Sequence, residues 1–106
     1  HLPHVVAAGL ANYVLSPAHV RTQALLCASG FRDTTRIAGS SPEMWRDIAL
    51  ANREHLGRSL GVLVADLQEF QRALDEQDAV AVEDFFSKAR TRRSDWLSAV
   101  RTPDAD

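Results

Sequence analysis

Six large apolar residues with the spacing of a packed helix constrain this fold most strongly. They are Leu56, Leu60, Leu63, Leu67, Phe70 and Leu74, and the intervals between them alternate between four and three. Residues at these intervals share one helical face, and the alternation is typical of helices that pack along their length. The pattern predicts a long helix that ends near the polar stretch 75–78. Asp78 is the expected cap of a final helix.

The last quarter of the chain carries a second apolar stripe. Its members are Val82, Phe85, Phe86, Ala89, Trp96 and Val100, which fall along one side of a helix. No segment alternates convincingly between apolar and polar residues with the period of a strand. The sequence therefore predicts an all-α fold, a helical bundle with long antiparallel helices.

Capping and breaking residues divide the first half of the chain into shorter helices. A first helix is expected up to about Leu15, and Pro17 suits the first position of a second one. The second helix is expected to end at Gly30, because glycine is favoured just past a helix. Residues 31–38 then predict a short helical turn. Ser41, followed by a proline, is the expected cap of the next helix.

Length and composition are those of a globular domain. With 106 residues, 45% hydrophobic and 25% charged, the chain predicts a single helical domain over residues 1–106. The net charge of −2 favours neither nucleic acid nor an anionic membrane as a partner, and no apolar run reaches the ~20 residues of a membrane span. The one cysteine, Cys27, fits a reducing compartment, so we expect a cytoplasmic protein. The chain starts at His1 with an uncapped helical pattern, so we expect an upstream part to be missing.

The long helix has apolar residues on more than one side. Val62 and Val64 flank the leucine seam. A solitary hairpin of helices would leave such side chains in water. We therefore expect a homodimer, with the helices of two chains intertwined. In the alternative, helices from the N-terminal half cover these valines within one chain.

The segment from Gly30 to Ala38 crowds charged residues into a short turn and is a candidate anion site. Arg36 presents a planar guanidinium that matches a carboxylate through two parallel hydrogen bonds. Asp33 lies three residues earlier, where it can hold the arginine in one rotamer, and Arg32 lies four residues earlier. On spacing alone, a surface arginine–aspartate pair of little energetic weight is the simpler explanation.

Two histidines, a serine and a tryptophan complete the candidate set. His1 and His4 are three residues apart, which places both imidazoles on one side of a helix. No His-Glu-x-x-His pattern and no acidic third ligand lies nearby, so no metal site is predicted. Solvated or capping histidines are the simpler alternative. Ser40 and Trp45 are weaker candidates, and on sequence alone Trp45 is most simply a core residue.

Two of these segments resemble a known family. The run 30–38, Gly-Phe-Arg-Asp-Thr-Thr-Arg-Ile-Ala, and the run 40–48 that follows are similar to the characteristic segment of prephenate dehydrogenases. That segment belongs to the helical domain that follows the nucleotide-binding half of those enzymes. The opening His1-Leu2-Pro3-His4 is similar to a second landmark of the same domain. The resemblance covers residues 1 to about 60 well and the remainder only in helical character.

The resemblance implies roles for four of the candidates. In the family, the arginine that matches Arg36 holds the ring carboxylate of the substrate, and the aspartate that matches Asp33 belongs to the polar network around it. By the same resemblance, His4 would contact the pyruvyl side chain of prephenate. His1 would shape the pocket near the cofactor.

The remaining implications concern the pocket wall and the whole enzyme. Ser40 and Trp45 would lie near the pocket wall or at the dimer contact. The complete protein would oxidise prephenate with NAD or NADP and release carbon dioxide, which gives 4-hydroxyphenylpyruvate for tyrosine biosynthesis. The cofactor and the catalytic base would be held mainly by an N-terminal dinucleotide-binding domain missing from this chain, so the fragment alone is expected to be inactive. The alternatives are an arogenate dehydrogenase domain, or a stand-alone helical dimerisation or regulatory module without catalysis.

Overall fold

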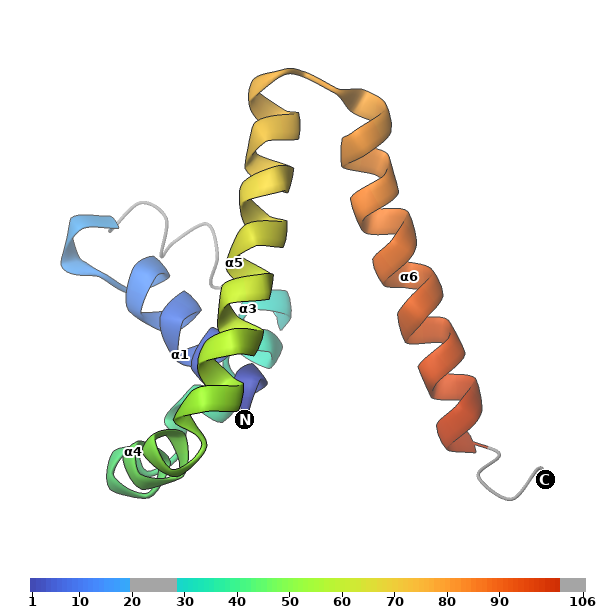
Figure 1. The fold of residues 1–106 in the computed structure, drawn as a ribbon. Coiled ribbons are helices and arrows are strands. Elements are labelled where there is room, and N and C mark those ends of the chain that lie inside the picture. The colour runs from blue at the N-terminus through green and yellow to red at the C-terminus, as the bar shows by residue number, and fades with distance from the viewer. Residues whose placement is uncertain (20–28, 102–106) are drawn as a thin grey trace. The chain divides into compact units, whose positions relative to one another are not determined.

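A computed structural model describes residues 1–19 and 29–101 of the chain (Figure 1). Every element in these two ranges is helical, which confirms the predicted all-α class. The elements in order are α1 (Leu2–Val14), the 3-10 helix η1 (Pro17–His19), α3 (Ser29–Thr34), the 3-10 helix η2 (Arg36–Gly39), α4 (Pro42–Ala51), α5 (Arg53–Asp75) and α6 (Ala79–Arg101). Most of the helix expected between Pro17 and Ser29, including Cys27, lies outside the described residues.

The chain groups into two compact units, His1–Gly61 and Val62–Asp106. The first unit contains the short helices and the start of α5, and the second contains the rest of α5 together with α6. The single domain expected over residues 1–106 stays a prediction.

Local sequence signals fix the starts of two helices. The Oγ of Ser41 accepts a hydrogen bond from the backbone N–H of Met44 at 3.3 Å, and Pro42 follows in the first turn of α4. The Oδ1 of Asp78 accepts a hydrogen bond from the N–H of Ala81 at 3.1 Å, at the start of α6. Both caps confirm the sequence predictions.

The C-terminus of α5 closes through a residue with left-handed backbone conformation. Gln77 has a φ of 53°. The N–H of Asp78 donates to the carbonyl of Ala73 at 2.9 Å, and the N–H of Gln77 donates to the carbonyl of Leu74 at 3.1 Å. This pair of hydrogen bonds is the Schellman motif, in which glycine is the usual left-handed residue.

The prediction that a helix ends at Gly30 is wrong. Gly30 lies inside α3, and no glycine in the described part of the chain has a positive φ. Two threonine hydroxyls in this segment form hydrogen bonds with the backbone one turn earlier. Thr34 Oγ1 donates to the carbonyl of Gly30 at 2.7 Å, and Thr35 Oγ1 donates to the carbonyl of Phe31 at 2.8 Å. Such back-bonding bends helices. The turn expected over residues 31–38 is accordingly divided between α3 and η2.

Few side chains are buried in the described residues. Ala7 and Val14 are buried in the first unit and Ala73 in the second. Around Ala73, the rings of Phe70, Phe85 and Phe86 form a cluster, in which the centroids of Phe70 and Phe85 lie 4.4 Å apart. The large exposed apolar residues of α5 and α6 are Val62, Val64, Leu67, Leu74, Val80, Phe85, Phe86, Trp96 and Val100. These two helices therefore present an extensive apolar surface to solvent.

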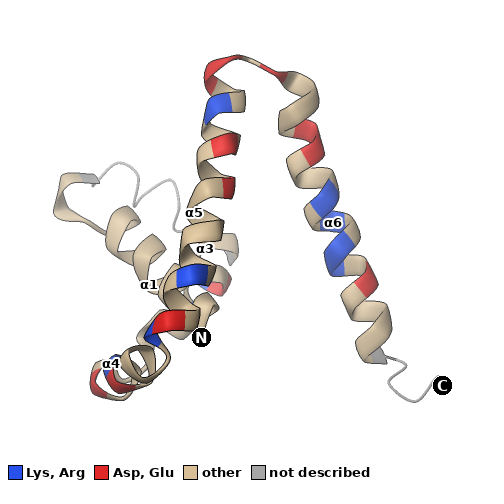
Figure 2. Ribbon diagram, in the orientation of Figure 1, with Lys and Arg blue, Asp and Glu red and all other residues tan. Residues whose placement is uncertain are grey.

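Charge is unevenly distributed along α5. Residues 59–65 carry no charged side chain, and Figure 2 shows this stretch as an uninterrupted tan segment of α5. Val62 and Val64 lie in this stretch and are 64% and 44% exposed. Even so, no helix in the described ranges is both long enough and apolar enough to cross a bilayer.

Candidate functional site

A cavity of about 370 Å³ lies in the first unit. Its walls come from His1 and one side of α1, from η2 and the residues after it, from α4, and from Leu56 of α5. Apolar side chains such as Val5 and Ile37 form much of the lining. Among the lining residues there is no lysine, arginine, aspartate or glutamate. The size and the mostly apolar walls with a few polar groups are typical of a small-molecule site.

Two imidazoles meet one indole at this cavity. The ring of His4 is stacked on that of Trp45, with centroids 3.6 Å apart and planes inclined by 18°. The ring of His1 stands edge-on to Trp45, at a centroid distance of 5.9 Å and an angle of 79°. All three residues line the cavity. The structure therefore brings together three candidates that the sequence had selected from separate segments.

The local fold explains how these rings meet. Trp45 stands one turn into α4, and its backbone N–H donates to the carbonyl of Ser41 at 3.1 Å. The cap at Ser41 thus sets where α4 begins and which direction Trp45 faces. His4 lies in the first turn of α1, and α1 contacts η2. Packing of α1 on η2 closes the cavity on the side of Ile37.

Ser40 also lines the cavity and is half-buried. Its hydroxyl donates to the carbonyl of Ile37 at 2.8 Å, across the end of η2. The hydroxyl proton is therefore committed to the backbone, while the oxygen lone pairs stay able to accept a hydrogen bond.

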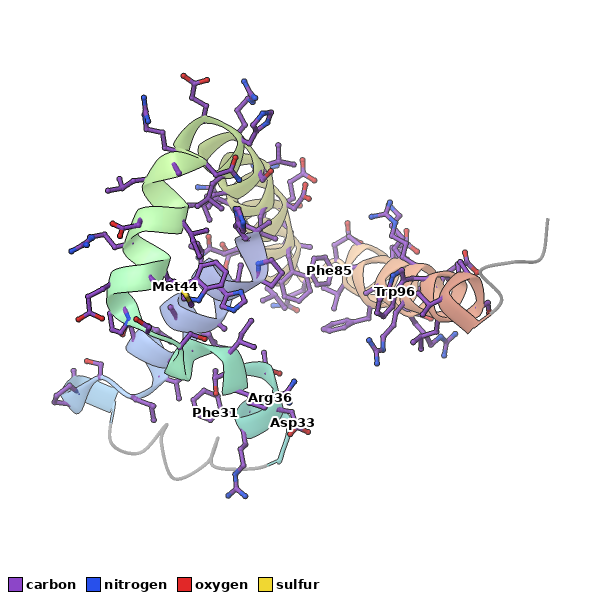
Figure 3. The ribbon with its side chains drawn as sticks, turned by 90° about the horizontal axis from the view of Figure 1, so that it is seen from below. Phe31, Asp33, Arg36, Met44, Phe85 and Trp96 are labelled. Carbon is purple, nitrogen blue, oxygen red and sulfur yellow. The ribbon has the colours of Figure 1, made fainter. Side chains whose placement is uncertain are left out.

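Arg36 and Asp33 are not brought to the cavity. Both side chains are exposed, neither lines the cavity, and the structure shows no ion pair between them. The expected pairing assumed one continuous helix, but α3 ends at Thr34 and Arg36 begins η2. Figure 3 shows both side chains on the α3–η2 segment. Arg36 is nevertheless the immediate neighbour of Ile37, which does line the cavity.

Two polar residues at the site, Asn12 in the cavity lining and Asn52 beside His1, were not predicted from the sequence. The side-chain nitrogen Nδ2 of Asn52 lies 2.9 Å from Nδ1 of His1. Asn52 is the residue between α4 and α5. An asparagine between two helical patterns is a signal for a helix end, but it does not reveal a contact 51 positions away.

The candidate site holds no cluster of metal ligands. Within residues 1–19 and 29–101, no three side chains of histidine, cysteine, aspartate or glutamate gather closely enough to hold a metal ion. The polar groups of the cavity are imidazoles, hydroxyls and the amide of Asn12. These groups suit hydrogen bonding to an oxygen-rich organic molecule.

Residues 1–88 match the family described as "Prephenate dehydrogenase, dimerization domain". The chain belongs to this family. The match includes every residue that lines the cavity, all of α5 and the first part of α6. The resemblance stated from the first 60 residues is therefore confirmed and extends further along the chain.

Individual members of the prephenate dehydrogenase family show the same similarity. The chain is 35% identical over 98 residues to a prephenate dehydrogenase of Bacillus subtilis, covering 88% of this chain and 25% of the relative. It is 36% identical over 95 residues to a cyclohexadienyl dehydrogenase of Zymomonas mobilis, covering 88% of this chain and 32% of the relative. A prephenate dehydrogenase of Lactococcus lactis is 31% identical over 97 residues. The chain thus spans between 25% and 32% of the length of these relatives.

Proposed function

We propose that this chain is the substrate-binding and dimerisation domain of a cytoplasmic prephenate dehydrogenase. The complete enzyme oxidises prephenate, with NAD or NADP as the hydride acceptor, to 4-hydroxyphenylpyruvate and carbon dioxide in tyrosine biosynthesis. The family match and the names of two relatives support this activity. The observation that carries the proposal is the cavity in which His1 and His4 meet Trp45.

The cavity suits the chemistry of prephenate, a compact ring that carries a keto acid, a second carboxylate and a hydroxyl. Apolar walls accept the ring, and a neutral imidazole can donate one hydrogen bond to an oxygen. In our proposal, His4 contacts the pyruvyl side chain, and its stacking on Trp45 fixes the plane from which it donates. His1, Ser40 and Trp45 shape the remaining wall.

Arg36 is proposed to hold the ring carboxylate, with Asp33 in the polar network around it. Its exposed guanidinium makes no ion pair with any described residue. Arg36 is also the first residue of the 3-10 helix that supplies Ile37 and Ala38 to the cavity. The ring carboxylate departs as carbon dioxide, so this contact serves to position the group and must not bind it so strongly that it cannot leave.

The described residues do not fit a nicotinamide dinucleotide. They contain no strand, and no glycine-rich turn leads from a strand into a helix whose N-terminus could hold the pyrophosphate. We propose that NAD or NADP is bound mainly by a part of the enzyme outside these residues. The fragment alone is accordingly expected to be inactive.

We propose that a second copy of the chain covers the apolar surface of α5 and α6 in a homodimer. Phe86 and Trp96 are 60% and 58% exposed, which is unusual for large aromatic side chains on a surface that no other protein covers. In the second unit, a hollow of about 500 Å³ has Phe70 and Ala73 in its lining and charged residues such as Arg92 beside them. An apolar centre with a polar rim is the composition of protein interfaces. The family description names a dimerization domain, which supports a second copy as the partner.

Steady-state kinetics of the complete enzyme test the proposal. Prephenate and arogenate are each supplied with NAD and with NADP, and formation of the aromatic product is followed. We expect turnover of prephenate. Turnover of arogenate alone would favour the arogenate dehydrogenase alternative. If neither substrate is turned over, the proposed enzymatic activity is wrong, and a helical module without catalysis is the remaining alternative.

A further inference from the structure

We propose that Asn52 is a positioning residue that holds the imidazole of His1 in one tautomer at the cavity. The contact joins Nδ2 of Asn52 to Nδ1 of His1 at 2.9 Å. An amide nitrogen only donates, so Nδ1 of His1 accepts and the ring carries its proton on Nε2. The consequence for catalysis rests on the proposed function, whereas the contact itself does not.

The backbone of Asn52 is fixed on both sides. Its N–H donates to the carbonyl of Ile48 at 3.2 Å, in the last turn of α4. Its carbonyl accepts from the N–H of Leu56 at 2.9 Å, in the first turn of α5. The residue is half-buried. Its amide therefore projects from a rigid junction between two helices, which is what a residue that orients another side chain requires.

Two contacts together define the position of the His1 ring. The amide of Asn52 holds one ring nitrogen, and the indole of Trp45 meets the ring edge-on at 79°. Within the described residues, the other ring nitrogen has no hydrogen-bond partner. It is left as an uncharged N–H donor at a cavity that lacks arginine and lysine. Such a donor suits a keto or carboxylate oxygen of the substrate.

The variant Asn52→Asp reverses this arrangement. A carboxylate only accepts, so it draws the imidazole proton to Nδ1 and leaves the neutral ring with an acceptor at Nε2. The side chain has nearly the same size, so packing at the helix junction changes little. Asn52→Ser is the second variant, because a hydroxyl can still donate and serine is tolerated at helix ends.

The tautomer is measured on the complete enzyme labelled with ¹⁵N-histidine, by long-range ¹⁵N–¹H correlation spectra. We expect His1 to show a bare Nδ1 and a protonated Nε2 in the wild type, and a protonated Nδ1 in N52D. His55 is an internal reference, since its Nδ1 lies 3.0 Å from Nη2 of Arg58 and it does not line the cavity. Its signals should be the same in both proteins. A protonated Nδ1 on wild-type His1, or an N52D spectrum equal to that of the wild type, would overturn the proposal.

Kinetics provide the second readout. We expect N52D to raise the KM for prephenate roughly tenfold, as for loss of a hydrogen bond to a charged group, and to change kcat less. N52S should lie between N52D and the wild type. A KM unchanged in both variants would show that Asn52 serves only the helix junction. If the wild-type enzyme does not turn over prephenate at all, the proposed function fails, while the spectra still decide the Asn52–His1 contact.

Discussion

His4 lies nearly flat on Trp45, with ring centroids 3.6 Å apart. This contact joins the first turn of α1 to the first half of α4, across 41 positions of the sequence. It thus has a structural role and a role in shaping the cavity, and the two can be separated by experiment.

The stacked pair should contribute measurable coupling energy to folding. Aromatic pairs contribute about 0.5–1.5 kcal/mol beyond their buried area. A double-mutant cycle with His4→Ala and Trp45→Ala, followed by urea unfolding at constant protein concentration, is expected to give coupling of this size. Trp45→Phe should keep most of it. Strictly additive losses for the two alanine variants would mean that the rings do not stack in solution.

Removal of the Arg36 guanidinium should weaken substrate binding in the complete enzyme. Truncation of one partner in a charged contact costs about 2–5 kcal/mol, so Arg36→Ala should raise the KM for prephenate at least about thirtyfold. Arg32→Ala is the matched control, because it removes the same charge from the exposed side of α3 one turn earlier. A KM for R36A within about twofold of that of the wild type would reject the proposed role.

The left-handed residue after α5 offers a stabilising substitution. Gln77 adopts a φ of 53°, a conformation that costs a residue with a Cβ about 1–2 kcal/mol relative to glycine. Gln77→Gly is therefore expected to raise the free energy of unfolding by about 1 kcal/mol. Gln71→Gly, inside the last part of α5, is the control and should lower the free energy of unfolding by a similar amount. Equal changes in the free energy of unfolding for the two variants would contradict the left-handed conformation of Gln77.

The apolar surface of α6 should be needed for dimerisation. Phe86→Asp and Trp96→Asp each place a charge on this exposed surface, and we expect both to shift the complete protein from dimer to monomer at micromolar concentration. Gln68→Asp introduces the same charge at an exposed polar position of α5 and should leave the dimer intact. Sedimentation velocity distinguishes the two species. A dimer that survives both aromatic substitutions would place the interface elsewhere.

The features predicted correctly depend on neighbours in the sequence. The caps at Ser41 and Asp78 and the long helix with the seam from Leu56 to Leu74 follow from residue type and spacing alone. The all-α class follows from the absence of strand patterns. These signals are local, so one sequence is sufficient to detect them.

The features that were missed depend on competition or on tertiary contact. At the end of α3, the hydroxyls of Thr34 and Thr35 donate to carbonyls four residues back, and the preference for glycine just past a helix does not take such hydrogen bonds into account. The helix is also interrupted at Thr35, so the three-residue spacing of Asp33 and Arg36 does not place the two side chains on one helical face. The contact of Asn52 with His1 joins residues that only the fold brings together.

Calorimetric titration of prephenate into the complete enzyme without cofactor measures substrate binding in the absence of turnover. The wild type is compared with His4→Ala and with His55→Ala, which removes an exposed histidine outside the cavity. If prephenate occupies the cavity at His4 and Trp45, the dissociation constant should rise about tenfold for H4A and stay unchanged for H55A. Equal affinity of H4A and the wild type would mean that prephenate does not bind in the cavity beside His4.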